Sequence, residues 1–346
     1  MNNKGIYLYG FVKDGYDTEN LSYPLGSEVY TVTCRDVTAV VSDMEKIDFT
    51  NLNMESLAQL LVHHQKTIED IMNSGCTAVV PFRLGTILNN KKELLKITET
   101  GYDLISDTFA KTENNVELDV VATWSDFGGI IEKFSQHPDI KDMKEKIMGK
   151  GGNVQQSDQI EIGKLFKSKI DEVRDTFAAR ITELLSPLSK EMKTHEVMND
   201  QMVLNTAFLI KGKMQEEFEN IINAIDEEFK GELNFKIVGP LPCYSFYTIE
   251  LKEFEYDLIE EAGNELALSG ITSAKDIKDA FKQMAKKYHP DKDNCNDNSD
   301  KYNRISDAYH TLLDYSLHLK KKSTSDSFSL EKEDVLSNLM SLKMKD

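Results

Sequence analysis

The hydrophobic pattern of the chain changes at Phe254, and this change limits the folds that are open to it. Before Phe254, short runs rich in β-branched and aromatic residues alternate with stretches whose apolar residues recur at helical spacing. From Phe254 to Leu319 the pattern is that of helices joined by loops. The sequence therefore predicts an α+β fold for the first part and a separate all-α module after it.

The first part divides into two predicted α+β units, over 1–114 and 115–252. We expect the second unit to be ferredoxin-like with a long helical insertion, followed by an all-α helical hairpin over 253–318 and a linker with a short helix over 319–346. The predicted strands are 6–12, 28–33, 38–41, 76–81, 116–124, 203–210, 233–238 and 244–251. The predicted helices are 54–72, 91–109, most of 126–193, 215–229 and 330–343.

The charge balance limits the classes of partner. The chain has 346 residues, with 41 Lys and Arg against 59 Asp and Glu, a formal net charge of −18. Such a field repels phosphates, so we expect no nucleic-acid partner and no lipid-membrane partner. The four cysteines form no CxxC pair, which argues against a structural zinc site. We expect no cofactor, no metal and a cytoplasmic location.

The sharpest motif is His289-Pro290-Asp291, which follows a predicted amphipathic helix over 276–288. The apolar residues of this helix share one face, and the opposite face carries Lys278, Lys282 and Lys286. Residues 275–292 hold six lysines against three aspartates in a chain that is acidic overall. The pattern indicates a local basic surface that ends at the tripeptide.

The segments AKDIKDAFKQMAKKYHPDK and KYNRISDAY make residues 254–315 similar to the J-domain of DnaJ-type co-chaperones. The resemblance implies docking on a DnaK-type chaperone and stimulation of its ATP hydrolysis. His289, Pro290 and Asp291 would trigger hydrolysis, while Lys278, Lys282 and Lys286 would steer the module to an acidic surface. The short fourth helix of the family is missing after Asp314.

A second copy of the tripeptide, His137-Pro138-Asp139, provides an internal comparison. The seven residues 128–134 before it contain one lysine and no basic stripe, and no aromatic pattern follows it. We therefore interpret this copy as a turn.

The segments GIYLYGFV, CTAVVPFRLGTIL and Gly239-Pro240-Leu241-Pro242 with their flanking runs make residues 1–252 resemble the GvpL/GvpF family of gas vesicle proteins. Leu241 and Cys243 depart from the family pattern, which more often has Trp and Pro there. The resemblance implies a non-catalytic factor in gas vesicle assembly. Its partners would be the hydrophobic major shell protein and other gas vesicle accessory proteins, at the surface of the vesicle or its growing shell.

A few polar residues in the first part could carry chemistry instead. His63 and His64 are expected to be a helix-surface or satisfied core pair, with a ligand or base as the alternative. Arg83 is expected in an ion pair rather than on an anion, and Cys76 is expected to be a small core residue. The loop 150–152 lacks the frame of a phosphate-binding loop.

Together these patterns predict a gas vesicle assembly factor fused to a J-domain, with no enzymatic activity of its own. One alternative is a general stress co-chaperone with an α+β client-binding platform. Two further alternatives are an enzyme with an appended J-domain and a purely structural shell component.

Overall fold

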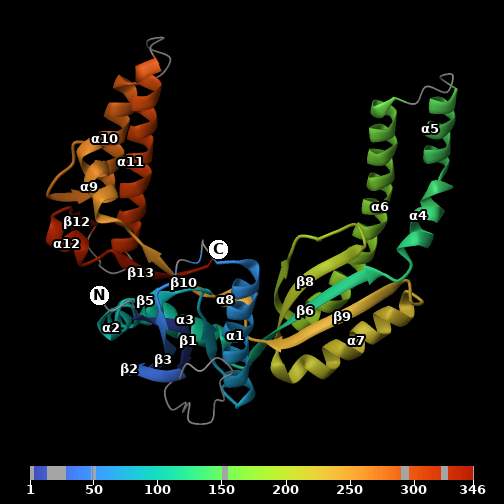
Figure 1. The fold of residues 1–346 in the computed structure, drawn as a ribbon, viewed down its shortest axis with the longest axis horizontal. Coiled ribbons are helices and arrows are strands. Elements are labelled where there is room, and N and C mark those ends of the chain that lie inside the picture. Colours follow the sequence, from blue (N-terminus) through green and yellow to red (C-terminus); the bar gives the residue numbers. More distant parts are fainter. Residues whose placement is uncertain are drawn as a thin grey trace. The chain divides into compact units, whose positions relative to one another are not determined.

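The computed structural model describes residues 4–13, 29–47, 49, 52–149, 155–289, 296–320 and 326–345. The chain forms two compact units that interleave along the sequence (Figure 1). The first unit combines 1–64, 82–108 and 249–346, and the second combines 65–81 and 109–248. The C-terminal module therefore shares a unit with the N-terminal strands.

The sheet of the first unit is organised around β1 (Lys4–Lys13). Strand β3 (Val37–Glu45) pairs with it in antiparallel fashion, and β2 (Val29–Cys34) pairs with β3. Every residue of β1 between its two ends is buried, which is typical of a central strand covered on both faces. The short strand β5 (Ile87–Leu88) pairs with β1 on its other edge. The predicted strands in this region are confirmed.

The described residues before Asn115 also form three helices. They are α1 (Met54–Asn73), α2 (Lys91–Thr100) and α3 (Tyr102–Thr112). The boundary between the two units falls inside α1 and inside α3. The one long helix predicted over 91–109 is therefore two helices, and Gly101 caps the end of the first.

His63 and His64 belong to the core of the first unit. The Tyr7 hydroxyl donates to Nδ1 of His64 (2.8 Å), and Nε2 of His64 lies 3.1 Å from the Phe82 carbonyl oxygen. The Tyr9 hydroxyl lies 2.9 Å from Nε2 of His63. Burial is the main cause that lowers the pKa of His64 to about 4, so this ring is neutral at physiological pH. The prediction of a satisfied core pair is confirmed.

The second unit contains a four-stranded antiparallel sheet with the order β7-β8-β6-β9. Its chain order, with helices after the first and third strands, is the ferredoxin-like arrangement that the sequence predicted. Its core joins residues of the strands to apolar residues of α6 and α7. The elements are β6 (Asn115–Trp124), β7 (Ser189–Thr194), β8 (Met202–Lys211), β9 (Leu233–Leu241), α4 (Phe127–Ser135), α5 (Pro138–Met148), α6 (Gln156–Leu185) and α7 (Gln215–Glu228), with the short strand β4 (Val79–Pro81) in segment 65–81.

Two strand assignments in this unit differ from the prediction. Residues 189–193 fall in the stretch that was expected to be mostly helical. Together with Thr194 they form β7 at the edge of the sheet, where backbone pairing with β8 holds a strand that has no apolar alternation. Residues 244–251 were expected to be one strand. They form instead the short helix α8 (Tyr244–Tyr247) and the strand β10 (Ile249–Glu253).

The described residues of the C-terminal module form three helices and one short strand. They are α9 (Tyr256–Glu265), β11 (Ile271–Ser273), α10 (Ala274–Lys287) and α11 (Asn296–Lys320). The strand β11 was not expected, because the pattern after Phe254 indicated only helices. Ile277, Ile305 and Leu312 are fully buried at the centre of the module.

The chain does not end in the single helix predicted over 330–343. Strand β12 (Ser327–Ser329) pairs with β11, the single turn α12 (Lys332–Leu336) follows, and β13 (Met340–Met344) pairs antiparallel with β10. We call residues 326–345 the C-terminal strap. The helical prediction was wrong because Leu342 and its neighbours are used by strand pairing with a distant segment.

Side chains of the strap contact the core of the C-terminal module and β10. Val335 is fully buried in the core of the C-terminal module. Lys343 pairs with Glu250 (2.8 Å), and Arg83 pairs with the other oxygen of the same carboxylate (2.9 Å). Burial alone would raise the pKa of Glu250, but the two cations lower it below its usual value. The ion pair predicted for Arg83 is confirmed.

Leu342 anchors the strap against α2. It is buried, and a Cβ atom added at Gly101 would lie only 2.5 Å from its Cδ1 atom. We expect Leu342→Ala to lower the free energy of local opening of β13 by about 2 kcal/mol, since a buried leucine loses its packing. Amide hydrogen exchange in 340–344 and 249–253 measures this change.

Leu336 on the same strap is 47% exposed and provides the matched control. Leu336→Ala should leave exchange in β10 and β13 close to that of the wild type. Equal effects of the two substitutions would contradict the role assigned to Leu342.

Candidate functional site

Helix α10 begins with a capping box. The Ser273 hydroxyl oxygen accepts a hydrogen bond from the Asp276 backbone N–H (3.2 Å), and the Asp276 carboxylate accepts one from the Ser273 backbone N–H (2.9 Å). These bonds satisfy groups that the first turn of a helix leaves unpaired. The start of the predicted basic helix is therefore fixed by its own sequence.

Packing against α11 decides which face of α10 meets the solvent. The rings of Phe281 and Tyr309 stack with their centroids 4.3 Å apart, and Ile277 is fully buried against the same core. Because the apolar stripe is used in this contact, the opposite face of α10 must point away from the core.

That opposite face carries the three predicted lysines. Lys278, Lys282 and Lys286 follow one another at four-residue intervals, and all three are exposed. None of them forms an ion pair with an acidic residue in the described part of the chain. We call these residues the lysine face. It is positioned to attract an acidic surface.

His289 lies just beyond the end of α10. It is exposed, and its ring meets the ring of Tyr302 on α11 edge-on, with centroids 6.0 Å apart. Lys286 lies in the last turn of the same helix, so the lysine face leads toward His289. Pro290 and Asp291 fall outside the described residues, and so does the loop 150–152.

The second tripeptide copy has a local structural role. His137 caps α5, with its Nδ1 atom accepting a hydrogen bond from the Asp139 backbone N–H (3.3 Å), and Pro138 is the first residue of the helix. Asp139 pairs with Lys169 of α6 (3.2 Å). This copy therefore starts a helix rather than forming an isolated turn.

A buried carboxyl group that the sequence reasoning missed lies in β6. Glu117 is 1% exposed, and its two oxygens accept hydrogen bonds from the backbone N–H (2.8 Å) and the hydroxyl group (2.7 Å) of Ser245. These bonds explain why 244–247 is helical, since α8 presents Ser245 to the strand. The signal in the sequence was a glutamate between Val116 and Leu118 in a predicted strand.

The Ser245 hydroxyl also lies 3.3 Å from Nε2 of His195, so a serine, a histidine and a carboxyl group meet here. The serine proton is donated to Glu117, however, and is not held by the imidazole as nucleophilic activation requires. Burial is the main cause that raises the pKa of Glu117 to about 7. The geometry indicates a cluster that anchors α8.

Two further findings concern other kinds of site. The described part of the chain contains no group of three or more His, Cys, Asp or Glu side chains arranged to hold a metal ion. None of the described helices combines the length and apolar character that a membrane crossing requires.

The fold and the lysine face define a protein of two parts, an α+β region and a co-chaperone-like helical module. The family model of the gas vesicle synthesis protein GvpL/GvpF matches residues 5–248, and the model of the DnaJ domain matches residues 264–319. The chain therefore belongs to the GvpL/GvpF family and carries a C-terminal DnaJ domain. Both resemblances noted in the sequence are confirmed.

Individual relatives agree with this assignment. Gas vesicle protein F of Nostoc sp. (strain PCC 7120) is 23% identical over 249 residues, which cover 71% of this chain and 99% of the relative. Gas vesicle protein F of Microcystis aeruginosa is 24% identical over 187 residues, or 54% of this chain and 76% of the relative. The chaperone protein DnaJ of Exiguobacterium sp. is 38% identical over 66 residues, or 19% of this chain and 17% of that protein.

Solved structures show the same fold. The crystal structure of GvpF from Anabaena sp. PCC7120 superposes with a TM-score of 0.60 at 22% identity, covering 70% of this chain and 98% of that chain. GvpF from Microcystis aeruginosa gives a TM-score of 0.59 at 21% identity, with the same coverage. The mixed α+β fold of the family is therefore present here, with the DnaJ domain after it.

The raised pKa of Glu117 gives a testable dependence of stability on pH. The folded protein holds a proton that the unfolded chain releases as the pH rises from about 4.5 to about 7, so this group makes the free energy of unfolding fall over that window. The slope reaches about 1.4 kcal/mol per pH unit at most. Urea unfolding between pH 5 and 8 should show a smaller loss of stability with rising pH in Glu117→Gln than in the wild type, while the neighbouring Asp119, whose pKa burial also raises, is retained in both. Equal dependence of the unfolding free energy on pH in the two proteins would contradict the role assigned to Glu117.

Proposed function

We propose that this chain assists gas vesicle assembly by binding the major shell protein and directing a DnaK-type chaperone to it. The observation that carries the proposal is the exposed lysine face, which leads to His289 on a DnaJ domain that shares a compact unit with strands of the GvpL/GvpF region. One chain thus combines a gas vesicle protein with a chaperone-recruiting module.

The chaperone contact rests on charge and on the tripeptide. Lys278, Lys282 and Lys286 steer the module toward an acidic surface of the chaperone, while His289, Pro290 and Asp291 trigger its ATPase. The chaperone supplies the nucleotide site and hydrolyses ATP. Because the lysine face is solvent-exposed, rising ionic strength should slow the association.

The shell protein is the client in this proposal. A subunit with exposed apolar strands self-associates unless it is shielded, and an acidic carrier keeps the complex dispersed. The edge strand β7 of the second sheet has backbone groups on its outer side that can pair with an added strand. The chain would act in the cytoplasm, at the surface of the growing vesicle and beside other gas vesicle accessory proteins.

The tripeptide can be tested by single-turnover ATP hydrolysis of the cognate DnaK-type chaperone. The wild-type chain should accelerate hydrolysis, and His289→Gln should reduce the acceleration at least about tenfold, which corresponds to about 1.4 kcal/mol of lost transition-state stabilisation. His289 is exposed, so its substitution leaves the core of the module intact.

The chain contains its own control for this test. His137 is the first residue of the second tripeptide copy and caps α5, and the segment 128–134 before it has no basic stripe. His137→Gln should stimulate the chaperone as well as the wild type does. Stimulation that survives His289→Gln, or that is lost equally in both variants, would contradict the proposed trigger.

A further inference from the structure

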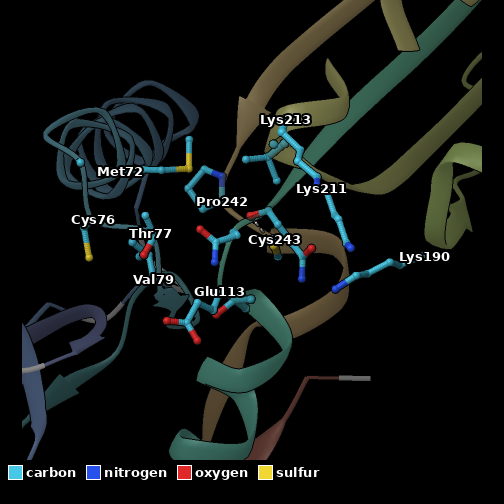
Figure 2. Close-up of a pocket in the computed structure, with 16 residues that line it drawn as sticks. Met72, Cys76, Thr77, Val79, Glu113, Lys190, Lys211, Lys213, Pro242 and Cys243 are labelled. Atoms are coloured by element: carbon cyan, nitrogen blue, oxygen red, sulfur yellow. Dashed lines mark hydrogen bonds between the residues drawn. The ribbon is translucent and has the colours of Figure 1, made fainter. Parts of the chain in front are cut away.

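A cavity in the second unit belongs to none of the roles described so far. Its volume is about 580 Å³, and all the residues that line it come from this unit. It lies where the end of α1, the end of α3 and the first residues of β6 meet the ends of β7 and β8 (Figure 2). Cavities of this size hold small organic ligands.

The inner wall of the cavity is apolar and neutral. Val79, Pro242 and Cys243 are buried, and Met72 is half-buried beside them. Burial is the main cause that raises the pKa of Cys243 to about 12, so its thiol carries no charge at physiological pH. This wall favours an apolar group, because a charged group buried against it would lose its hydration without gaining a partner.

The rim is positively charged. Lys190, Lys211 and Lys213 are exposed and line the cavity together with Glu113, so the rim carries a net charge of about +2 in a chain of net −18. None of the three lysines has an ion-pair partner among the residues placed in the structure. Figure 2 shows Lys190 and Lys211 on one side of the cavity, with Met72 and Cys76 on the other.

The backbone holds this arrangement in place. Ser189 is opposite Ile210 and Glu191 is opposite Leu209, so Lys190 is the additional residue of a β-bulge. Bulges redirect side chains and occur often beside functional sites.

Backbone hydrogen bonds also fix the other segments that line the cavity. The backbone N–H of Asn114 donates to the Thr77 carbonyl oxygen, and the backbone N–H of Gly212 donates to the Asn114 carbonyl oxygen, both at 3.0 Å. Asn114 adopts the left-handed conformation (φ 59°) that this crossing of the chain requires. The cavity is therefore formed before any ligand arrives.

We propose that this cavity binds a small amphiphilic organic anion, with its carboxylate between Lys190, Lys211 and Lys213 and its apolar body against Met72, Val79 and Pro242. Charge-assisted hydrogen bonds from the ammonium groups hold the carboxylate at the rim. Burial of the alkyl chain against the inner wall supplies the rest of the affinity. The site is distinct from the lysine face, whose residues belong to the other unit.

Octanoate and 1-octanol test the proposal, because they share an apolar chain and differ in charge. Cys76 lines the cavity and is half-exposed, so an occupied cavity should slow its alkylation by iodoacetamide. Cys34 is also half-exposed, lies in the other unit and serves as the internal reference. Octanoate should protect Cys76 at concentrations about tenfold lower than octanol does, and neither should protect Cys34.

Matched lysine variants separate charge recognition from general apolar binding. The double variant Lys190→Gln, Lys211→Gln should weaken octanoate protection about tenfold and leave octanol unchanged. Lys236→Gln, at an exposed lysine on β9 outside the cavity, should behave like the wild type. Absence of protection by octanoate, equal protection by both ligands, or equal effects of the cavity and control variants would each overturn the proposal.

Discussion

The pairing of β10 with β13 is the interaction on which the architecture of the first unit depends. Strand β10 begins just after the part of the chain that matches the GvpL/GvpF model, and β13 comes after the part that matches the DnaJ domain. Their antiparallel register extends from Ile249 opposite Met344 to Glu253 opposite Met340. The strap therefore joins the DnaJ domain to β10 and, through Leu342, to the end of α2, and neither family model includes it.

Local patterns in the sequence predicted those helices and strands whose own apolar residues recur at helical or strand spacing. The stripe around Ile277 predicted α10, and the run of aromatic and β-branched residues over 6–12 predicted β1 as a strand. The sequence did not indicate β7 or β13, because such strands are held by backbone pairing with distant partners rather than by an apolar face of their own.

The candidate sites show the same difference between local patterns, which the sequence reveals, and contacts between distant segments, which it does not. The lysine face could be predicted, since four-residue spacing on an amphipathic helix places Lys278, Lys282 and Lys286 on the side opposite the core. The contact between Glu117 and Ser245 could not, because it joins residues 128 positions apart through a helical turn that interrupts a strand-like run. The cavity lined by Lys190, Lys211 and Lys213 likewise forms only when five separate segments meet.

The DnaJ domain and the GvpL/GvpF region belong to one chain. Covalent linkage raises the concentration of the chaperone around whatever the rest of the chain binds. The capture of the cognate chaperone on immobilised shell subunits, with ATP and the intact chain, tests this account most directly. The account predicts capture that requires both the chain and His289 and that exceeds capture on an unfolded model protein. Equal capture without the chain, or equal capture on both clients, would contradict it.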